Sequence, residues 1–580
     1  EVVEGRSPRR DLTRGAVEAI LARRTEPRRP GVVAVIDDAI AFANERFRDG
    51  ARTRLSRYWA QTPTLHPDLI HLLGLQLDRD GIDALLEANR IGGEVDEAGA
   101  YRDAGLLDFS RPWRTGLGMH ATHGTVVADL AFGERAAPDG LALFAVELPR
   151  QAIADTTLQR LQPYIFQAFI WILYEVLVVA HEDSAGLSPV VVNLSFGDTA
   201  GPHDGTGELE IAMDFLTTLL PPEAPLAFVL PAGNSHLARG HAAFSLSPTQ
   251  SGGTPSRRIP WRIQPDDKTV SLVQIWTPPV PLPVVPRLRV RLVPPGGTDG
   301  DATAWRLEGD GGPATKYGPH DAPAAQIGWR YSTASGRGAF VVLVEPTAPF
   351  DVDPSGGPAR PVAASGSWTI EVALVPPQDG APTVPTALRC DAYIERDDTP
   401  VGYRGSGRQS YFDADCYVRF DAAGTPIGAV LESDGDDCLV RRGGAMNAIA
   451  TGCRTIVAAA LVGATGRAAA YSAGGPVRTG TCAGEPAREG PDVAAIADDS
   501  LVHRGVLAAG TYGGTVVVAS GTSAATARIA RRLAIGLMAG IMPSRDGIRQ
   551  DATGPAGGEE RIGAGLVRVP ASYPVRRLDH

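Results

Sequence analysis

Cysteine is scarce in this sequence, and its spacing does not suit zinc. The 580 residues include five cysteines, and no two of them form a Cys-x-x-Cys pair. Structural zinc sites usually take their thiolates from such closely spaced pairs, so a zinc site is not expected. The odd count favours free thiols, with a disulfide as the open alternative.

The sequence also lacks a long basic run. It has 55 Lys and Arg against 66 Asp and Glu, a net charge of -11, and the basic residues are scattered along the chain. Proteins that bind nucleic acid usually carry a basic patch or stripe. Nucleic acid is therefore not the expected partner, and nothing in the pattern indicates an oligomeric state.

Signals that would direct the chain to a membrane are also missing. Residues 1–30 are charged and Arg-rich and lack the apolar core of a signal peptide. A cytoplasmic location is slightly favoured; because the chain has no initiator Met, secretion after removal of a leader is the alternative. One apolar run, residues 161–180, is interrupted by Gln162, Gln167 and Glu175, so we expect a buried helix rather than a membrane span.

Short apolar runs rich in β-branched residues are present in two separate parts of the chain. Helical patterns lie between them, which is typical of an α/β fold with a doubly wound, mostly parallel sheet. At 43% hydrophobic residues and this length, the chain can build one large core and at least one further domain. The runs are Gly31–Ile36, Leu141–Val146, Val190–Leu194, Leu226–Leu230 and Thr455–Ala460.

Between these two parts, Pro- and Gly-rich turns separate short β-type runs, such as the strictly alternating Arg287–Leu292. This texture predicts an all-β insertion, a sandwich or jelly roll, inside the α/β domain. The expected division is an N-terminal extension (1–30), the first part of the α/β domain (31–245, with an elaboration at 40–115), the insertion (246–445, with a β core at about 259–388), the second part (446–545) and a C-terminal tail (546–580).

Four polar residues stand where a strand run ends or a helical run begins. Asp37 ends the first apolar run, Asn234 follows the fourth, and His123 and Ser523 open helical runs. Functional groups collect at the carboxyl ends of strands in α/β sheets. Each residue alone is more typical of a turn or a helix cap, and the pair His120 and His123 suggests a metal but has no third ligand nearby.

Taken together, these residues and their neighbours resemble the signature blocks of the subtilisin-like serine peptidases, the subtilases. The blocks follow the order Asp, His, Asn, Ser, and the order of Asp, His and Ser is that of the family's catalytic triad. They are Val33–Asp37, His123–Thr125, Ala232–Asn234 and Gly521–Ala525, with supporting matches at Asn193–Gly197, Ala470–Pro476 and Arg561–Val567.

The resemblance implies a serine endopeptidase that acts on proteins or peptides. Asp37, His123 and Ser523 would be its catalytic residues, and Asn234 would be an oxyanion-hole donor. The substrate would lie along the following residues: Ser195, Phe196 and Gly197 on one strand, and Pro231, Ala232 and Gly233 beside the pocket for the side chain before the cleaved bond.

No cofactor is required for this chemistry, and no metal site can be assigned. Subtilases often carry structural calcium, so calcium is an open expectation for this chain. The acidic segment 432–437 is suggestive but lacks the spacing of an EF-hand loop, and a solvated acidic loop is the simpler interpretation.

The chain departs from the family pattern beside the catalytic residues. Asp38-Ala39 stands where a Thr or Ser and a Gly are usual, and Asp38 is expected to raise the pKa of His123 if it faces the site. Val126, Asp129, Ala527 and Arg528 replace other customary residues. Two alternative functions stay open: a narrow-specificity maturation protease whose β insertion screens the cleft, and a peptide-binding scaffold that does not cleave.

Overall fold

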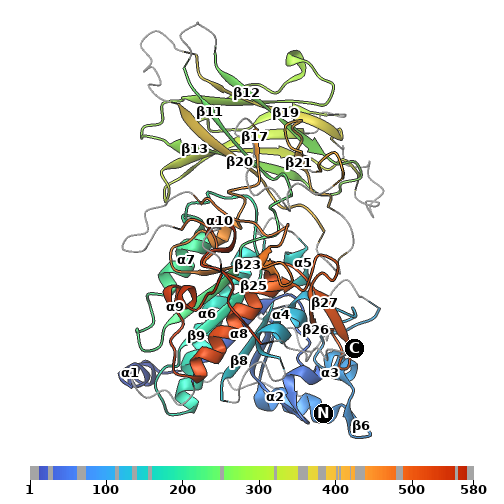
Figure 1. The fold of residues 1–580 in the computed structure, drawn as a ribbon, viewed down its shortest axis with the longest axis vertical. Coiled ribbons are helices and arrows are strands. Elements are labelled where there is room, and N and C mark those ends of the chain that lie inside the picture. The colour runs from blue at the N-terminus through green and yellow to red at the C-terminus, as the bar shows by residue number, and fades with distance from the viewer. Residues whose placement is uncertain are drawn as a thin grey trace.

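The computed structural model of the chain contains an α/β unit and, above it in Figure 1, a β unit built from the middle of the sequence. The residues that the structure describes are 12–23, 30–61, 74–110, 116–133, 140–154, 160–248, 254–318, 323–349, 363–376, 387–399, 403, 407–418, 420–424, 438–477, 488–554 and 559–570. The acidic segment 432–437 and most of the N-terminal extension lie outside them.

The α/β unit is organised around a nine-stranded sheet of order β24-β23-β10-β9-β1-β8-β4-β5, with β25 beside β23. The central pairs are parallel, and the edge strands β5 and β24 are antiparallel to their neighbours. This confirms an α/β fold with a mixed, largely parallel sheet. The strands are β1 (Val32–Asp37), β4 (Leu55–Ala60), β5 (Leu75–Asp78), β8 (Ala142–Glu147), β9 (Val190–Leu194), β10 (Leu226–Pro231), β23 (Ile456–Val462), β24 (Arg467–Ala468) and β25 (Val493–Asp498).

Helices cover both faces of this sheet, because alternate side chains of its strands are apolar on both sides. Val33 and Val35 of β1 pack in the core beneath α4 (His123–Phe132) and α8 (Thr522–Met538). The intervening residues of β1 pack in a second core with α6 (Gln162–Glu182) and α7 (Glu208–Leu216). The sheet is thus buried on both faces, and its polar strand ends are left at the edge.

Helix α6 is the apolar run noted in the sequence. It is the one helix among the described residues that is long and apolar enough to cross a membrane by length and composition. Ile165, Phe169 and Ile172 are buried in the second core, and half of the helix's most apolar window is covered. Its apolarity is therefore used, at least in part, to cover the sheet.

Segment 40–115 is more than a surface elaboration, because it supplies strands to the main sheet. β4 pairs in parallel with β8, and β5 pairs with β4. Tyr58 and Leu77 are buried in the first core. The remaining elements of the α/β unit are α1 (Arg14–Ala22), β2 (Arg48–Asp49), β3 (Arg52–Thr53), α2 (Arg79–Ala88), β6 (Arg90–Ile91), β7 (Glu94–Val95), α3 (Glu97–Asp103), α5 (Arg150–Ile153), α9 (Arg545–Gln550) and α10 (Glu559–Ile562).

The strand before Ser523 does not belong to the main sheet. β27 (Val516–Ala519) pairs with β26 (Val506–Ala509) in a separate two-stranded sheet rather than joining the main sheet. Its side chains alternate between exposed and half-buried. The composition of four β-branched or small apolar residues is the same in a buried strand and in a surface hairpin, so it does not indicate which of the two will form.

The middle of the chain forms two antiparallel sheets that share one core, which includes the buried rings of Trp261, Phe340, Trp368 and Phe412. The first sheet contains β16 (Ala314–Tyr317), β17 (Pro323–Ser332), β18 (Arg337–Val344), β13 (Ser271–Pro279), β20 (Leu388–Ile394), β11 (His241–Leu246) and β22 (Val440–Arg441). The second contains β15 (Arg306–Leu307), β14 (Leu288–Val293), β19 (Gly366–Leu374), β12 (Ser256–Ile263) and β21 (Tyr411–Phe412). The first sheet begins at His241, within the segment 31–245 that the sequence assigns to the α/β domain.

Most of the described cysteines are not free thiols, contrary to expectation. Cys416 and Cys438 form a disulfide, and Cys453 is also disulfide-bonded. Cys390, buried in the insertion core, is the free cysteine among the described residues. Cysteine count and spacing alone could not show these pairings, because partners that are close in space can be far apart in sequence.

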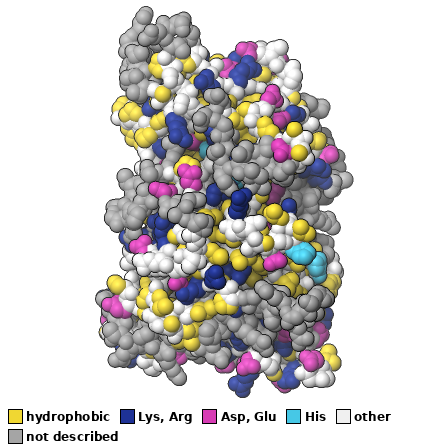
Figure 2. Space-filling model, viewed as in Figure 1, with side chains coloured by type: hydrophobic (Ala, Val, Ile, Leu, Met, Phe, Trp, Pro, Cys, Tyr) yellow, Lys and Arg dark blue, Asp and Glu magenta, His cyan; other side chains and the backbone are white. Residues whose placement is uncertain are grey.

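Charged side chains are interspersed on the face of the molecule drawn in Figure 2. Basic and acidic groups alternate with hydrophobic and neutral ones, and neither sign forms a continuous field on that face. This agrees with the scattered distribution of charge in the sequence.

Candidate active site

Asp37 and His123 form a hydrogen-bonded pair at the edge of the main sheet. Asp37 is the last residue of β1 and is fully buried, and His123 is the first residue of α4. Asp37 Oδ1 lies 2.6 Å from His123 Nδ1 and also accepts the backbone N–H of Asp38 at 2.7 Å. A carboxylate bound to Nδ1 directs the other ring nitrogen, Nε2, toward the open side of the site.

Gly124 permits this pairing. A Cβ atom at this position would lie 2.3 Å from the carbonyl oxygen of Asp38, which is backbone and cannot move aside cheaply. The first turn of α4 can therefore contact the end of β1 only when residue 124 has no side chain. The His-Gly pair in the sequence is thus explained by packing as well as by chemistry.

Ser523 lies in the first turn of α8, after Gly521, whose φ of 115° is a conformation that favours glycine. Its Oγ donates to the carbonyl oxygen of Ser195 at 3.4 Å. The ring of Phe196, the next residue, lies 6.2 Å from the His123 ring, centroid to centroid. Ser523 and His123 thus flank the same short segment, although within the described chain they are not hydrogen-bonded to each other.

Asn234 is held beside the Ser523 turn by its side-chain oxygen. Asn234 Oδ1 accepts the backbone N–H and the hydroxyl of Thr522, each at 3.0 Å. The hydroxyl of Thr522 in turn accepts the N–H of Gly233 at 3.2 Å. With Oδ1 fixed in this way, the amide nitrogen of this exposed side chain is left as a hydrogen-bond donor at the mouth of the site.

A pocket of about 250 Å³ opens beside Ser523. Of the residues that the resemblance assigns to substrate binding, Ser195, Phe196, Gly197, Pro231 and Gly233 line it. Ala232 does not, since it is fully buried in the second core. The remaining lining residues are Asp198, Thr199, Asn234, Ser235, Ala238, Arg396, Asp398, Gln409, Asn447, Thr522 and Ser523.

Asn447 joins the two walls of this pocket and was not singled out from the sequence. Its amide nitrogen donates to the carbonyl oxygens of Phe196 and Pro231, each at 3.0 Å. Its amide oxygen accepts the N–H groups of Asp198 and Ile449, each at 3.2 Å. The sequence offers one indication of a role for Asn447, which is its position at the point where the α/β pattern resumes after the insertion.

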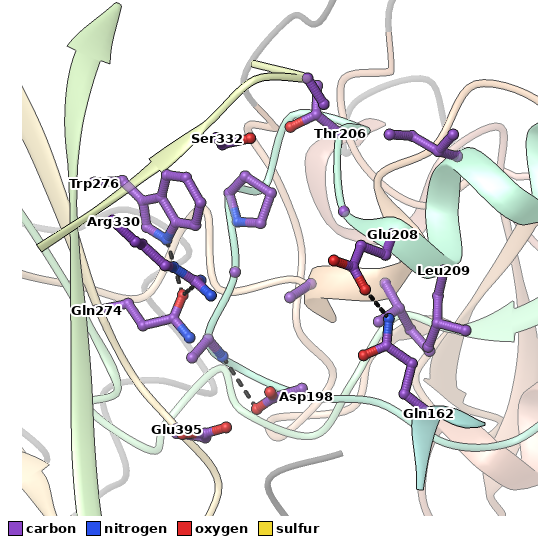
Figure 3. A pocket seen from close by; sticks show the side chains of 18 of the residues that line it. Gln162, Asp198, Thr206, Glu208, Leu209, Gln274, Trp276, Arg330, Ser332 and Glu395 are labelled. Carbon is purple, nitrogen blue, oxygen red and sulfur yellow. Dashed lines mark hydrogen bonds between the residues drawn. The ribbon is translucent and has the colours of Figure 1, made fainter. Parts of the chain in front are cut away.

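Asp198 follows Gly197 directly and lies between two pockets. Its Oδ1 accepts the N–H groups of Thr199 and Ala200 at 2.6 and 3.2 Å and, more weakly, that of Arg396 at 3.5 Å. Burial raises the pKa of Asp198 to about 7, against the opposing effect of these hydrogen bonds. It also lines a larger pocket of about 580 Å³ between the two units, shown in Figure 3.

The insertion also reaches the acid next to Asp37. Tyr403 donates its hydroxyl to Asp38 Oδ2 at 3.2 Å, and the Arg150 guanidinium lies 3.9 Å above the centre of the Tyr403 ring. Burial, followed by the charge of Asp37, raises the pKa of Asp38 to about 6. Asp38 therefore faces the site, as considered from the sequence.

The pKa of His123 is raised above its ordinary value. Burial acts to lower it, but 39% of the side-chain surface is exposed, and the hydrogen bond to Asp37 and the charges of Asp37 and Asp38 prevail. The positive charge of Arg396 acts in the opposite direction. An imidazole with these neighbours can accept a proton and be stabilised once charged.

Tyr471, in the supporting block Ala470–Pro476, contacts the turn that carries Ser523. Its hydroxyl oxygen accepts the N–H of Gly521 at 2.9 Å. Burial and then the negative charge of Asp498 raise the pKa of Tyr471, so the phenol stays protonated. The hydroxyl can thus accept from Gly521 while it donates to Asp498.

Two departures from the family pattern have structural explanations. Asp129 is buried in α4 and accepts hydrogen bonds from Arg46 Nε at 2.7 Å and from the N–H of Ala509 at 2.9 Å. Arg528, in α8, donates to the carbonyl oxygens of Ile496 and Val569 at 2.6 and 2.8 Å. Both side chains tie the helices to the α/β core, away from the Asp37–His123 pair.

Residues suited to binding a metal ion do not gather in the part of the chain that the structure describes. Within it, no cluster of three or more His, Cys, Asp or Glu side chains is arranged to hold an ion. The arrangement around Ser523 instead joins a hydroxyl, an imidazole, a buried carboxylate and an amide donor.

Comparison with protein families and curated proteins identifies no family model and no curated relative. Among solved structures, the chain is similar to the CspB protease of Clostridium perfringens, with a TM-score of 0.57, 15% identity and coverage of 96% of each chain. A tailspike protein of Acinetobacter baumannii phage AM24 aligns with a TM-score of 0.12, 10% identity and coverage of 39% of this chain and 42% of that one, which carries no argument. The chain is therefore similar in fold to the CspB protease over nearly its whole length.

Proposed function

We propose that this protein is a serine endopeptidase of the subtilisin-like type. The observation that carries the proposal is the pair of buried Asp37 and His123 Nδ1 at 2.6 Å, placed across the Ser195-Phe196 segment from Ser523. A likeness in fold to a protein described as a protease supports the same conclusion.

In the proposed reaction, Ser523 Oγ attacks the carbonyl carbon of the bond to be cleaved. His123 takes the hydroxyl proton and later gives it to the leaving amine, while Asp37 orients and stabilises the imidazolium. The oxyanion accepts hydrogen bonds from the side-chain amide of Asn234 and the backbone N–H of Ser523. Water then hydrolyses the acyl-enzyme, and no cofactor takes part.

The peptide substrate would add as an extended strand beside residues 195–197, with one side chain in the pocket next to Ser523. In this proposal, residues 31–245 and 446–545 form the catalytic domain, and residues 246–445 form its insertion. The first residues of β11, which precede residue 246, belong with the insertion because β11 pairs with β20. The participation of insertion residues in the pocket favours a narrow-specificity processing protease over a broad one.

A fluorophosphonate probe tests the proposal, because it reacts covalently with an activated serine. We expect the wild-type protein to be labelled and Ser523→Ala not to be labelled. Ser245→Ala, a change at an exposed position of β11, serves as the matched control and should label like the wild type.

A non-cleaving scaffold is the second candidate, favoured by the hydrogen bond of Ser523 Oγ to Ser195 rather than to His123. In that case the folded wild-type protein would bind peptides but would not react with the probe. A control subtilisin-like enzyme labelled in parallel would establish that the probe is active.

A further inference from the structure

The pocket beside Ser523 has more acidic than basic groups. Its ionisable lining residues are Asp198, Asp398 and Arg396. Arg396 pairs with Asp398, which leaves Asp198 as the carboxylate without a cationic side chain bonded to it among the described residues. The field inside the pocket therefore favours a positive charge on whatever enters.

Two amide donors of the pocket, those of Asn447 and Gln409, are used within the protein. Asn447 Nδ2 donates to two carbonyl oxygens, and Gln409 Nε2 donates to the carbonyl oxygens of Glu395 and Ser410 at 3.1 and 3.3 Å. By contrast, the hydrogen bonds that Asp198 accepts from the described residues Thr199, Ala200 and Arg396 all end on Oδ1, so Oδ2 can still accept. A side chain rich in donors would satisfy it, whereas another acceptor would not.

The larger pocket on the other side of Asp198 continues this acidic character. Figure 3 shows Asp198, Glu208 and Glu395 around the cavity, with one labelled base, Arg330, on the same side as Glu395. Arg330 donates to Gln274 Oε1 at 2.8 Å and lies 5.2 Å from the centre of the Trp276 ring. Its guanidinium is held beside Gln274 and Trp276, and the nearby carboxylates of Glu395, Glu208 and Asp198 all act on it.

The pocket walls suit the long aliphatic part of a basic side chain. Phe196, Pro231 and Ala238 give its lining an apolar part. The methylene groups of Lys or Arg can pack along such walls while the charged end reaches a carboxylate. An acid in the specificity pocket of a serine peptidase selects a basic residue in this way.

We propose that the substrate residue before the cleaved bond is Arg or Lys, and that Asp198 is the residue that selects it. This inference rests on the proposed peptidase function. The positive charge of Arg396, at the rim of the pocket, would repel a basic side chain. Its guanidinium is, however, paired with Asp398 through two nitrogens. Asp198 is the deeper group, since it is 7% exposed.

The test is a set of peptides that differ only in the residue before the cleaved bond: Arg, Lys, Gln, Leu and Glu. We expect kcat/KM for Arg and Lys to exceed that for Gln and Leu by at least about 10-fold, with Glu the poorest. Asp198→Asn should lower kcat/KM for the basic peptides roughly 10- to 100-fold and leave the Leu peptide nearly unchanged. The amide oxygen of Asn keeps the backbone hydrogen bonds, so this variant should melt within a few degrees of the wild type.

Asp398→Asn is the matched control. It removes the negative charge that pairs with Arg396, so it should lower kcat/KM for the basic peptides by a smaller factor and raise kcat/KM for the Glu peptide. The inference is overturned if a wild-type protein that reacts with the probe and cleaves peptides prefers Leu or Glu before the cleaved bond. It is also overturned if Asp198→Asn lowers kcat/KM equally for all five peptides. Failure of the wild type to react with the fluorophosphonate probe would instead overturn the peptidase proposal.

Discussion

The two units of this protein contribute to the same candidate site in different ways. The α/β unit supplies Asp37, His123, Asn234 and Ser523, each at the end of a strand or the start of a helix. The β insertion carries no recognisable motif, yet Arg396, Asp398 and Gln409 line the pocket. The groups proposed for bond cleavage all come from the α/β unit, whereas those proposed for choosing a substrate come from both units: Asp198 from the segment after β9, and Arg396 and Asp398 from the segment after β20.

Because of this difference, substitutions in the two units should change different properties of the enzyme activity that we propose. Changes in the α/β unit should lower the rate of the chemical step. Changes in the insertion, or at the junction between the units, should alter substrate choice, affinity or pH dependence. The following predictions, from the largest effect to the smallest, separate these outcomes.

The largest effect is expected for Asp37→Asn. An amide at this position favours the wrong imidazole tautomer and cannot stabilise the imidazolium, so kcat should fall about 10⁴-fold. Steady-state kinetics with a single peptide measures the loss. Asp49→Asn, an exposed acid of β2, is the control and should keep wild-type activity; a similar loss in both variants would contradict the assignment of Asp37.

Asn234→Ala should lower kcat by roughly 10²- to 10³-fold and change KM little, because its amide donor acts mainly on the oxyanion. The same variant also removes the acceptor of two Thr522 hydrogen bonds. Asn234→Asp keeps an acceptor there but offers no N–H, so it should be as slow as the Ala variant. Full turnover in either variant would remove Asn234 from this role.

Asn447→Ala tests the junction between the units. Two carbonyl oxygens would lose their shared donor, at a cost of about 1 to 3 kcal/mol for each buried group left unsatisfied. We expect KM to rise about 10-fold and kcat to fall by a smaller factor, together with a lower melting temperature. A fall in kcat alone would place Asn447 with the groups of the chemical step rather than with the pocket.

Asp38→Asn should shift the pH dependence. Its negative charge helps to raise the pKa of His123, so removing it lowers that pKa, and the rise of kcat/KM with pH moves to lower pH by about one unit. Tyr403→Phe removes a hydrogen bond that lowers the pKa of Asp38, so more of Asp38 is protonated near neutral pH. The shift should have the same sign and be smaller.

Tyr411→Phe, another tyrosine of the insertion whose ring lies under Arg239, is the control for Tyr403→Phe. It should leave the pH profile unchanged. If Tyr403→Phe lowers activity equally at every pH, the insertion supports the site only structurally.

The sequence was informative where local chemistry and regular structure coincide. The strand before Asp37 and the helices that begin near His123 and Ser523 were predictable from apolar runs and small residues at turns. The pairing of Asp37 with His123 was expected from the resemblance, and the structure places their side chains 2.6 Å apart.

The pocket was less predictable, because its far end is built by contacts between distant parts of the chain. Asn447 bonds to Pro231 across 216 residues, and no periodic pattern marks such a contact. Ala232 was expected in the pocket from its neighbours, but the pleat of the strand turns alternate residues to opposite sides and buries it. The pairing of β27 with β26 was not predictable either, since composition does not specify a pairing partner.

The position of the insertion also has a consequence for folding. The main sheet is interrupted after β10 and resumes at β23, which pairs Val229 with Ile456 in parallel. Such a distant pairing is slow to form, because the entropy of closing the loop must be overcome before the contacts form. Within the insertion, however, β11 pairs with β22, and His241 lies opposite Arg441. Once the insertion folds, its two ends are side by side, and the remaining loop is short. Helix α8 follows β23 in the chain, so we expect Ser523 to join its partners only after the insertion has brought the two halves together.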